Sequence, residues 1–170
     1  MAGRREHPST QVELRVVTPD DWRIWRAVRL EALGEAPYAF SSTLADWDSA
    51  PPERFRARLA IDGSHNLVAV LDGRPVGMAS GVPGDDPETV DLLSMWVSPD
   101  VRGDGTADAL VTAIEGWARE RGARALGLEV VATNDRARRL YERHGLVVTG
   151  EVERESPTDP LELRMCKTLD

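Results

Sequence analysis

The stretch Ser98 to Val111, SPDVRGDGTADALV, places Arg102, Gly103 and Gly105 between an apolar run and an apolar, periodic segment. A strand is expected to end and a helix to begin here, although glycine lowers helix stability. The first N–H groups of a helix lack backbone partners and carry the positive end of its dipole, and glycine lets them approach a phosphate. Together with the permanent charge of Arg102, this pattern predicts a pyrophosphate site. An ordinary turn and helix cap is the alternative.

The spacing of the glycines excludes two other phosphate-binding motifs. RGDGTAD lacks the third glycine of the dinucleotide fingerprint, and no glycine-rich loop ends in Gly-Lys-Ser or Gly-Lys-Thr. The preceding strand, DLLSMWV, does not open the chain as the first strand of a Rossmann half would.

The surrounding elements alternate between strand and helix patterns. Strands are predicted over 12–17, 66–82 (a hairpin around Asp72-Gly73), 89–97, 125–132, 146–154 and 161–169. Helices are predicted from Thr18 onward and over 52–61, 104–122 and 134–145, with Thr18 and Asn134 as caps. We expect a long loop over 34–52, a disordered tail over 1–11, and one mixed α/β domain over 12–170.

The composition fits a globular protein of 170 residues, with 41% apolar residues and a net charge of -8. The negative charge argues against a nucleic-acid partner. The single cysteine, Cys166, excludes an internal disulfide, and we expect it to be structural. His7, His65 and His144 lack metal-ligand spacing, so no metal is expected. No apolar run has membrane-spanning length and no secretory segment follows Met1, which predicts a cytoplasmic protein without a membrane partner.

Downstream of the turn, the segment NDRARRLYERHGL places Asn134, Ala137 and Tyr141 at a definite spacing. With SMWVSPDVRGDGTADAL, it makes the chain resemble the GNAT superfamily of acyl-coenzyme A-dependent N-acyltransferases from Val12 to Leu169. The family turn, Gln/Arg-x-x-Gly-x-Gly/Ala, is matched by Arg102, Gly105 and Ala107. The resemblance implies a mixed, mostly antiparallel central sheet flanked by helices, whose fourth and fifth strands are splayed by a β-bulge.

The resemblance also implies where acetyl-coenzyme A binds. Its pantetheine would lie between the splayed strands against the backbone of Met95, Trp96 and Val97, and the N–H of Val97 would polarise the thioester carbonyl. Asn134 would contact pantetheine or the acceptor. The pyrophosphate would be held by the amides of Arg102, Gly103, Asp104, Gly105, Thr106 and Ala107.

In the same comparison, Tyr141 matches the general acid of the family. A phenol with a pKa of about 10 stays neutral at working pH and can protonate a thiolate leaving group. The base that deprotonates the amine is less defined. Asp91 stands six residues before Val97, where some relatives carry a glutamate, and is one candidate. Glu129 and a water are the other candidates. Both Asp91 and Glu129 could instead be solvated or salt-bridged carboxylates without a catalytic role.

Some residues depart from the family pattern. Asp104 and Asp108 place negative charge near the expected pyrophosphate, and Thr106 replaces an aliphatic residue. Two functions therefore stay open: an N-acetyltransferase that acts by direct attack in a ternary complex, and a non-catalytic acyl-coenzyme A-binding module. An unrelated nucleotide-binding domain is disfavoured by the missing fingerprints.

The acceptor is expected to be a small-molecule or peptide amine. Its wall is predicted in 36–47 and 154–161, where aromatic and acidic residues favour a cationic acceptor without net negative charge. Relatives are often dimers, so the resemblance leaves a homodimer open. The wall and its neighbouring positions contain Tyr38, Phe40, Asp46, Trp47, Asp48, Glu153 and Glu155.

Overall fold

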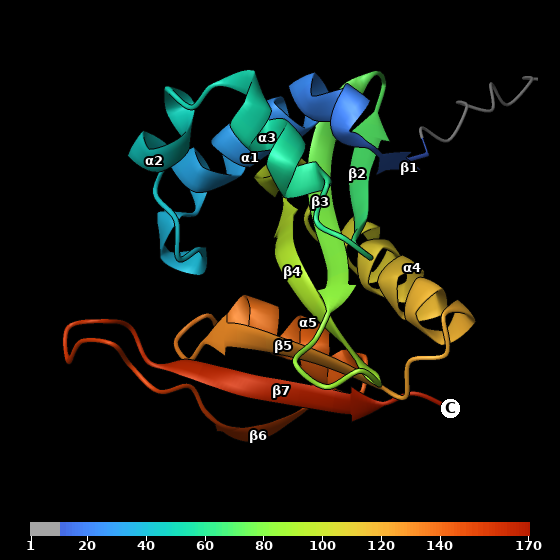
Figure 1. The fold of residues 1–170 in the computed structure, drawn as a ribbon, viewed down its shortest axis with the longest axis vertical. Helices are drawn as coiled ribbons and strands as arrows, with labels where there is room; N and C mark the ends of the chain where they lie inside the picture. The colour runs from blue at the N-terminus through green and yellow to red at the C-terminus, as the bar shows by residue number, and fades with distance from the viewer. Residues whose placement is uncertain (1–10) are drawn as a thin grey trace, which may run out of the picture.

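Residues 11–170 are described by a computed structural model, in which a seven-stranded sheet carries helices on both faces (Figure 1). The strand order is β1-β2-β3-β4-β5-β7-β6, and only β4 and β5 run parallel. The predicted tail lies outside the described residues except for Gln11. The strands are β1 (Glu13–Val17), β2 (His65–Leu71), β3 (Arg74–Pro83), β4 (Thr89–Val97), β5 (Ala125–Val131), β6 (Val147–Glu151) and β7 (Glu162–Thr168). The helices are α1 (Trp22–Glu35), α2 (Leu44–Asp48), α3 (Pro52–Leu59), α4 (Thr106–Glu120) and α5 (Asp135–Arg143).

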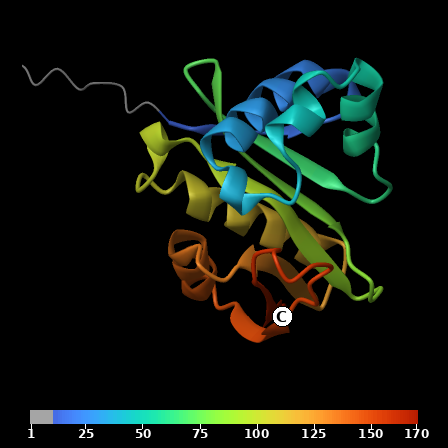
Figure 2. The same cartoon turned by 90° about the vertical axis from the view of Figure 1, so that its left-hand side faces the viewer.

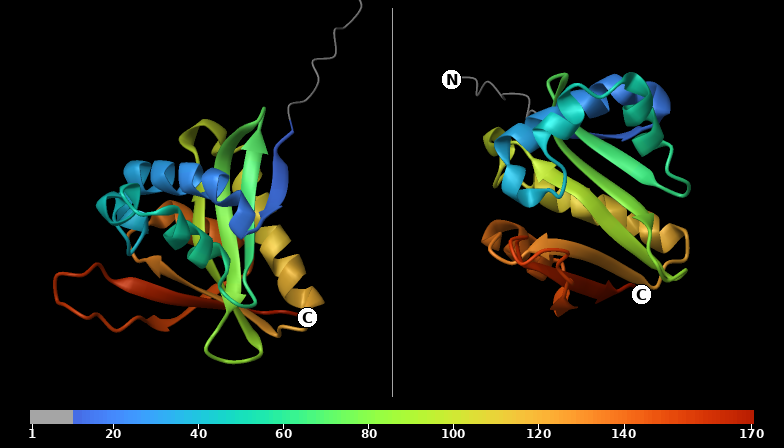
Figure 3. Two further views of the ribbon diagram at one scale, coloured as in Figure 1. Left: turned by 45° about the horizontal axis from the view of Figure 1, so that its top comes forward. Right: turned by 60° about the vertical axis from the view of Figure 1, so that its left-hand side comes forward.

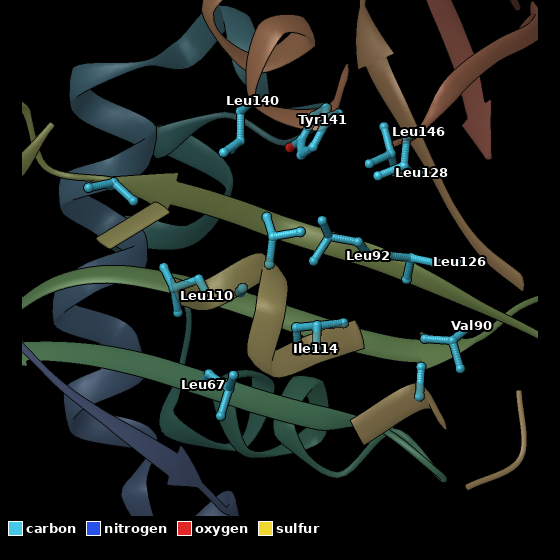
Figure 4. Packing of buried hydrophobic residues seen from close by; sticks show 14 of the residues in the cluster. Leu67, Val90, Leu92, Leu110, Ile114, Leu126, Leu128, Leu140, Tyr141 and Leu146 are labelled. Atoms are coloured by element: carbon cyan, nitrogen blue, oxygen red, sulfur yellow. The ribbon is translucent and has the colours of Figure 1, made fainter. Parts of the chain in front are cut away.

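Two apolar cores form because successive residues of a strand point to opposite faces of the sheet. On one face, Val68 and Met78 pack with Trp25 and Phe55 beneath helices α1 to α3. Seen from the side in Figure 2, these helices lie over the β1–β4 part, and the C-terminal strands lie below it. The other core lies under α4 and α5 (Figure 4) and contains Leu67, Leu92, Leu110, Ile114, Leu126, Leu128, Leu140, Tyr141 and Met165 among its buried residues.

The sheet opens between β4 and β5. The two strands pair only over 89–91 and 125–127, after which they separate. Strand β4 also contains an extra residue, because Met78 pairs with Trp96 while Ser80 pairs with Leu93. Ser94 within this bulge has a φ of 54°, a conformation that is uncommon outside glycine. Figure 3 shows the C-terminal strands turning away from the β1–β4 part, which confirms the predicted splay.

The predicted long loop is wrong in part. Its middle forms helix α2, where Thr43 and Asp46 exchange capping hydrogen bonds and Trp47 is buried. The hydrogen bonds of a capping box let even a short helix form within a polar segment. Thr18 also caps as predicted, although Pro19–Asp21 forms a 3₁₀ turn ahead of α1. Within residues 11–170, no helix combines the length and apolarity that crossing a bilayer requires.

Candidate active site

A cleft of about 730 Å³ lies between the end of β4, the glycine turn and helix α5. We call it the large cleft. Asp91, Asp104 and Thr106 do not line it. The predicted site residues that do line it are Met95, Trp96, Val97, Arg102, Gly103, Gly105, Ala107, Asn134 and Tyr141.

The backbone of Val97 points into the opening between β4 and β5. In the antiparallel pair with β3, the N–H of Ser98 bonds to the carbonyl of Val76, while Gly77 stands opposite Val97. Because hydrogen-bonded and non-bonded pairs alternate along such a ladder, the N–H and C=O of Val97 face away from β3. The carbonyl is accordingly reached from that side by Nε of Arg102, at 3.0 Å. The N–H of Val97 is therefore oriented as an oxyanion donor requires.

The glycine turn presents free backbone donors to the large cleft. Gly103 and Gly105 have φ values of 85° and 95°, and a Cβ at either would meet no atom within 4 Å. Glycine is therefore required at both positions by the backbone conformation and not by a lack of room for a side chain. Within residues 11–170, the N–H groups of Gly103, Gly105 and Ala107 donate no hydrogen bond to another backbone group. This arrangement fits a pyrophosphate.

Arg102 does not supply the free positive charge that the sequence suggests. Its guanidinium donates to both carboxylate oxygens of Glu35, at 3.2 and 2.7 Å. The indole N–H of Trp96 also donates to Glu35, at 2.9 Å. These bonds lower the pKa of Glu35, with Arg102 as the main cause. Because Arg102 also holds Val97, it positions the end of β4. Sequence reasoning missed Glu35, which lies 67 positions away.

Other cations line the large cleft where no motif indicated them. Arg136 and Arg143 of α5 both contribute to its wall. Arg143 is paired with Asp108 at 3.1 Å, whereas Arg136 is an exposed residue at the second position of α5. The basic run DRARR around them was visible in the sequence and is the signal that could have identified Arg136.

The acidic residues near the turn are engaged by neighbouring groups. Asp104 accepts hydrogen bonds from the N–H and the hydroxyl of Thr106, at 2.9 and 2.7 Å. Two residues that depart from the family pattern are thus bonded to each other. Asp108 accepts from Arg143 and contacts Nε2 of His144 at 2.8 Å. These partners lower the pKa of Asp108 despite its partial burial. The negative charge near the turn is therefore partly compensated.

A smaller cavity of about 300 Å³ adjoins the large cleft on the side of helices α1 and α3. We call it the small cavity. Ala39, Met95, Asn134, Ala137 and Tyr141 line both spaces, so Tyr141 stands at their junction.

Helix α5 fixes Tyr141 at this junction. Asn134 caps the helix, accepting from the N–H of Ala137 at 3.3 Å as predicted. The Tyr141 side chain is only 6% exposed and lies with Leu128 and Leu140 on the α5 side of the core in Figure 4. Burial raises the pKa of the Tyr141 phenol above its ordinary value. A phenol in this setting keeps its proton at neutral pH and can donate it.

The carboxylates considered as bases lie in different surroundings. Asp91 lines neither space and is paired with Arg164 at 2.6 Å across Gly127. Glu129 lines the small cavity, as does Glu162, which the sequence analysis did not select. Glu162 stands opposite Val131, the second residue after Glu129, so both carboxylates share one face of the sheet. Burial and then Glu129 raise the pKa of Glu162.

His65, His144 and Cys166 lie outside both spaces, and His7 is outside the described residues. His144 caps the end of α5 and bonds to Asp108, and His65 stacks on Trp117 at 4.9 Å. Cys166 is half-buried on β7. In the described part of the chain, no group of three or more His, Cys, Asp or Glu side chains is arranged to hold a metal ion.

Comparison with known proteins places this geometry in context. An uncharacterized N-acetyltransferase of Mycobacterium bovis is 37% identical over 84 residues, covering 49% of this chain and 53% of the relative. The N-acetylaspartate synthetase of Rattus norvegicus is 29% identical, covering 84% of this chain and 52% of the relative. The chain thus spans about half the length of these two relatives.

The fold has close structural counterparts. A putative acetyltransferase of Salmonella typhimurium, solved with its cofactor acetyl-CoA, superposes with a TM-score of 0.74 at 22% identity, covering 95% of each chain. The sequence model of the acetyltransferase (GNAT) family matches residues 26–146. That match takes in the whole of β4, the glycine turn and α5, and most of this chain. The chain therefore belongs to the acetyltransferase (GNAT) family.

Proposed function

We propose that the protein transfers an acetyl group from acetyl-coenzyme A to a primary amine by direct attack in a ternary complex. The observation that carries this proposal is the position of Tyr141 at the junction of the two spaces. One space would hold the cofactor and the other the acceptor, so a proton donor at their meeting point stands beside the reacting atoms.

The large cleft fits acetyl-coenzyme A, which supplies the acetyl group as a thioester with a thiolate leaving group. The free N–H groups of Gly103, Gly105 and Ala107 would bind its pyrophosphate. Arg136 would add positive charge at the mouth of the cleft. Met95 and Val97 would pair with the pantetheine along the open edge of β4.

The protein's own groups would then act in three places. The N–H of Val97 would donate to the carbonyl oxygen as negative charge develops there. Tyr141 would give its proton to the departing sulfur. Glu129, directly or through a water, would take the proton that the amine loses when its nitrogen bonds to the carbonyl carbon. Glu162 lies on the same face of the sheet, and burial and then Glu129 raise its pKa, which makes it a stronger proton acceptor than an ordinary glutamate.

Tyr141→Phe tests the proposal, because it keeps the ring and removes the proton donor. We expect kcat for acetyl transfer to fall about 10²-fold, with little change in acetyl-coenzyme A affinity. Tyr38→Phe is the matched control, because Tyr38 lines the large cleft but is 60% exposed. Coenzyme A release with a panel of amines gives kcat, and calorimetry gives the affinity. Equal kcat in parent and Tyr141→Phe, where chemistry limits the rate, would refute the role of Tyr141.

The same assays separate the transferase from a non-catalytic acyl-coenzyme A-binding module. Such a module would bind acetyl-coenzyme A but release no coenzyme A with any amine of the panel. The features that suggested it, Asp104 and Asp108, are engaged by Thr106, Arg143 and His144.

A further inference from the structure

Two arginines line the small cavity, and neither has a carboxylate partner among the described residues. Arg29 of α1 is 6% exposed, and Arg58 of α3 is half-buried. Within residues 11–170, no Asp or Glu oxygen lies within 4.0 Å of either guanidinium. A buried charge is costly unless it is paired, so this arrangement calls for an anion that the chain does not supply.

The partners that the arginines do have are neutral and leave donors free. The hydroxyl of Ser94 accepts from Arg29 at 3.4 Å and from Arg58 at 3.2 Å, and Asn66 accepts from Arg58 at 3.2 Å. Each guanidinium carries five N–H donors, and Nε of Arg29 is buried with no hydrogen-bond partner in the described part of the chain.

Tryptophans hold the guanidinium planes. Arg29 lies over Trp47, with its Cζ 4.4 Å from the ring centroid, and Arg58 lies over Trp25 at 5.3 Å. A guanidinium that stacks on an aromatic ring keeps its edge available for a carboxylate, which such a planar fork binds with two parallel bonds. Burial and then the neighbouring Arg58 lower the pKa of Arg29 to about 10, as expected for positive charge without compensation.

The opposite wall of the small cavity carries the reverse charge. Glu129 and Glu162 line it from β5 and β7. Two carboxylates on one wall and two guanidinium groups on another make the cavity complementary to a small molecule that has a negative and a positive end. Its volume of about 300 Å³ lies at the lower limit for ligand pockets, which favours a compact ligand.

We propose that the small cavity binds the acceptor as a free α-amino acid, with its carboxylate on Arg29 and Arg58 and its amine toward Glu129 and Glu162. This inference rests on the transferase function proposed above and names its substrate class. It narrows the expectation of an amine acceptor without net negative charge to a zwitterion, in which a carboxylate accompanies the amine. For acetyl transfer, the amine end would have to reach Tyr141, which lines both spaces.

Matched acceptors test the carboxylate directly. The common L-amino acids, their amides and their decarboxylated amines are compared in the coenzyme A release assay, with an aminoglycoside as a polycationic competitor. We expect at least one amino acid to exceed its own amide and amine by about 10²-fold or more in kcat/KM, because loss of the carboxylate leaves buried donors unpaired. Equal values within each set, or a preference for the polycation, would overturn the inference.

Variants assign the effect to the arginines. Arg58→Gln should reduce the preference for the amino acid over its amide about tenfold or more, and Arg58→Lys should retain part of it. Arg54→Gln is the control, because Arg54 also lies over Trp47, with its Cζ 4.2 Å from the ring centroid, but does not line the cavity. If Arg54→Gln and Arg58→Gln, both with native circular dichroism, change the preference equally, the assignment is wrong.

Binding without catalysis separates this inference from the proposed function. Calorimetry on the coenzyme A-loaded protein measures affinity for the preferred amino acid and for its amide. If amines are acetylated equally well with and without a carboxylate, the transferase function is supported and the amino-acid site is refuted. Carboxylate-dependent binding that Arg58→Gln abolishes, without any coenzyme A release, would refute the transferase and support the site. Absence of both binding and turnover for every amino acid would refute the site.

Discussion

The substitution Glu35→Gln distinguishes two roles for Arg102, because the two roles predict different changes in acetyl-coenzyme A affinity. If Arg102 serves as a phosphate-binding cation, removal of the carboxylate frees it and acetyl-coenzyme A binds more tightly. If Arg102 positions β4, the loss of its anchor loosens Val97, and catalysis falls while affinity does not rise. The hydrogen bonds of Arg102 to Glu35 and to the Val97 carbonyl favour the second outcome.

The magnitude follows from the exposure of the pair. The side chains of Arg102 and Glu35 are 24% and 28% exposed, so their charge-assisted hydrogen bonds are partly screened. We expect the variant to lose about 1–2 kcal/mol of stability, which lowers Tm by about 2–8 °C in a domain of this size. A small displacement of the Val97 N–H should lower kcat about tenfold.

Glu31→Gln provides the matched control for this experiment. Glu31 lies one turn earlier on α1 and approaches Arg74 only at 3.9 Å on the exposed surface, so the same charge is removed away from the site. Melting curves, calorimetry with acetyl-coenzyme A and coenzyme A release are measured on both variants. Tighter cofactor binding with unchanged kcat in Glu35→Gln alone would refute the positioning role.

The pH dependence of stability gives a second signature of this pair. Since Arg102 lowers the pKa of Glu35 in the folded state, the pair contributes fully above the ordinary glutamate pKa of about 4.3. The contribution is lost as pH falls through the lower pKa of the folded state. The difference in Tm between parent and Glu35→Gln should therefore be constant near neutrality and shrink below about pH 4.

Three further substitutions test other parts of the site. Gly105→Val places a branched side chain at a φ of 95° in open space, so we expect acetyl-coenzyme A affinity measured by calorimetry to fall about tenfold or more while circular dichroism stays native. Gly127→Ala places a Cβ against the guanidinium of Arg164. Denaturation should therefore show a loss of about 1 kcal/mol in the parent background but a gain of about 0.5 kcal/mol in the Arg164→Ala background, and equal effects would contradict the clash. The pKa of Glu162 is raised in the folded state, so the stability of the protein falls as pH rises through that pKa. Glu162→Gln should therefore have a slightly higher Tm than the parent at pH 7, together with a lower kcat/KM. A lower Tm would contradict this prediction.

Local patterns predicted most of the elements and the backbone part of the site. The alternation along β2 to β5, the cap at Asn134 and the glycines of the turn depend on neighbours within a few residues, and each is found as predicted. Helix α2 was predictable in principle, because Thr43 and Asp46 have the spacing of a capping box. The length of the surrounding polar segment concealed it.

Charge partners were not predictable in the same way. Arg102 finds Glu35 across 67 positions, and Asp91 finds Arg164 across 73, so no local pattern connects them. The charge that lines a cavity is also set by long-range packing. It depends on which few side chains the fold turns inward, and here two of them are Arg29 of α1 and Arg58 of α3, which no local pattern indicated.

These long-range pairs compensate for what β4 loses when the sheet opens. Beyond Asp91, β4 pairs with no strand of residues 11–170 on the β5 side, so the ladder no longer fixes the strand there. Arg164 holds Asp91 at the last paired position, Arg29 and Arg58 hold Ser94, and Arg102 holds the carbonyl of Val97. Each contact comes from a different part of the fold and acts on β4 near the edge of the proposed active site. An opening for a bound thioester can therefore persist in the sheet because arginine side chains replace the missing backbone pairs.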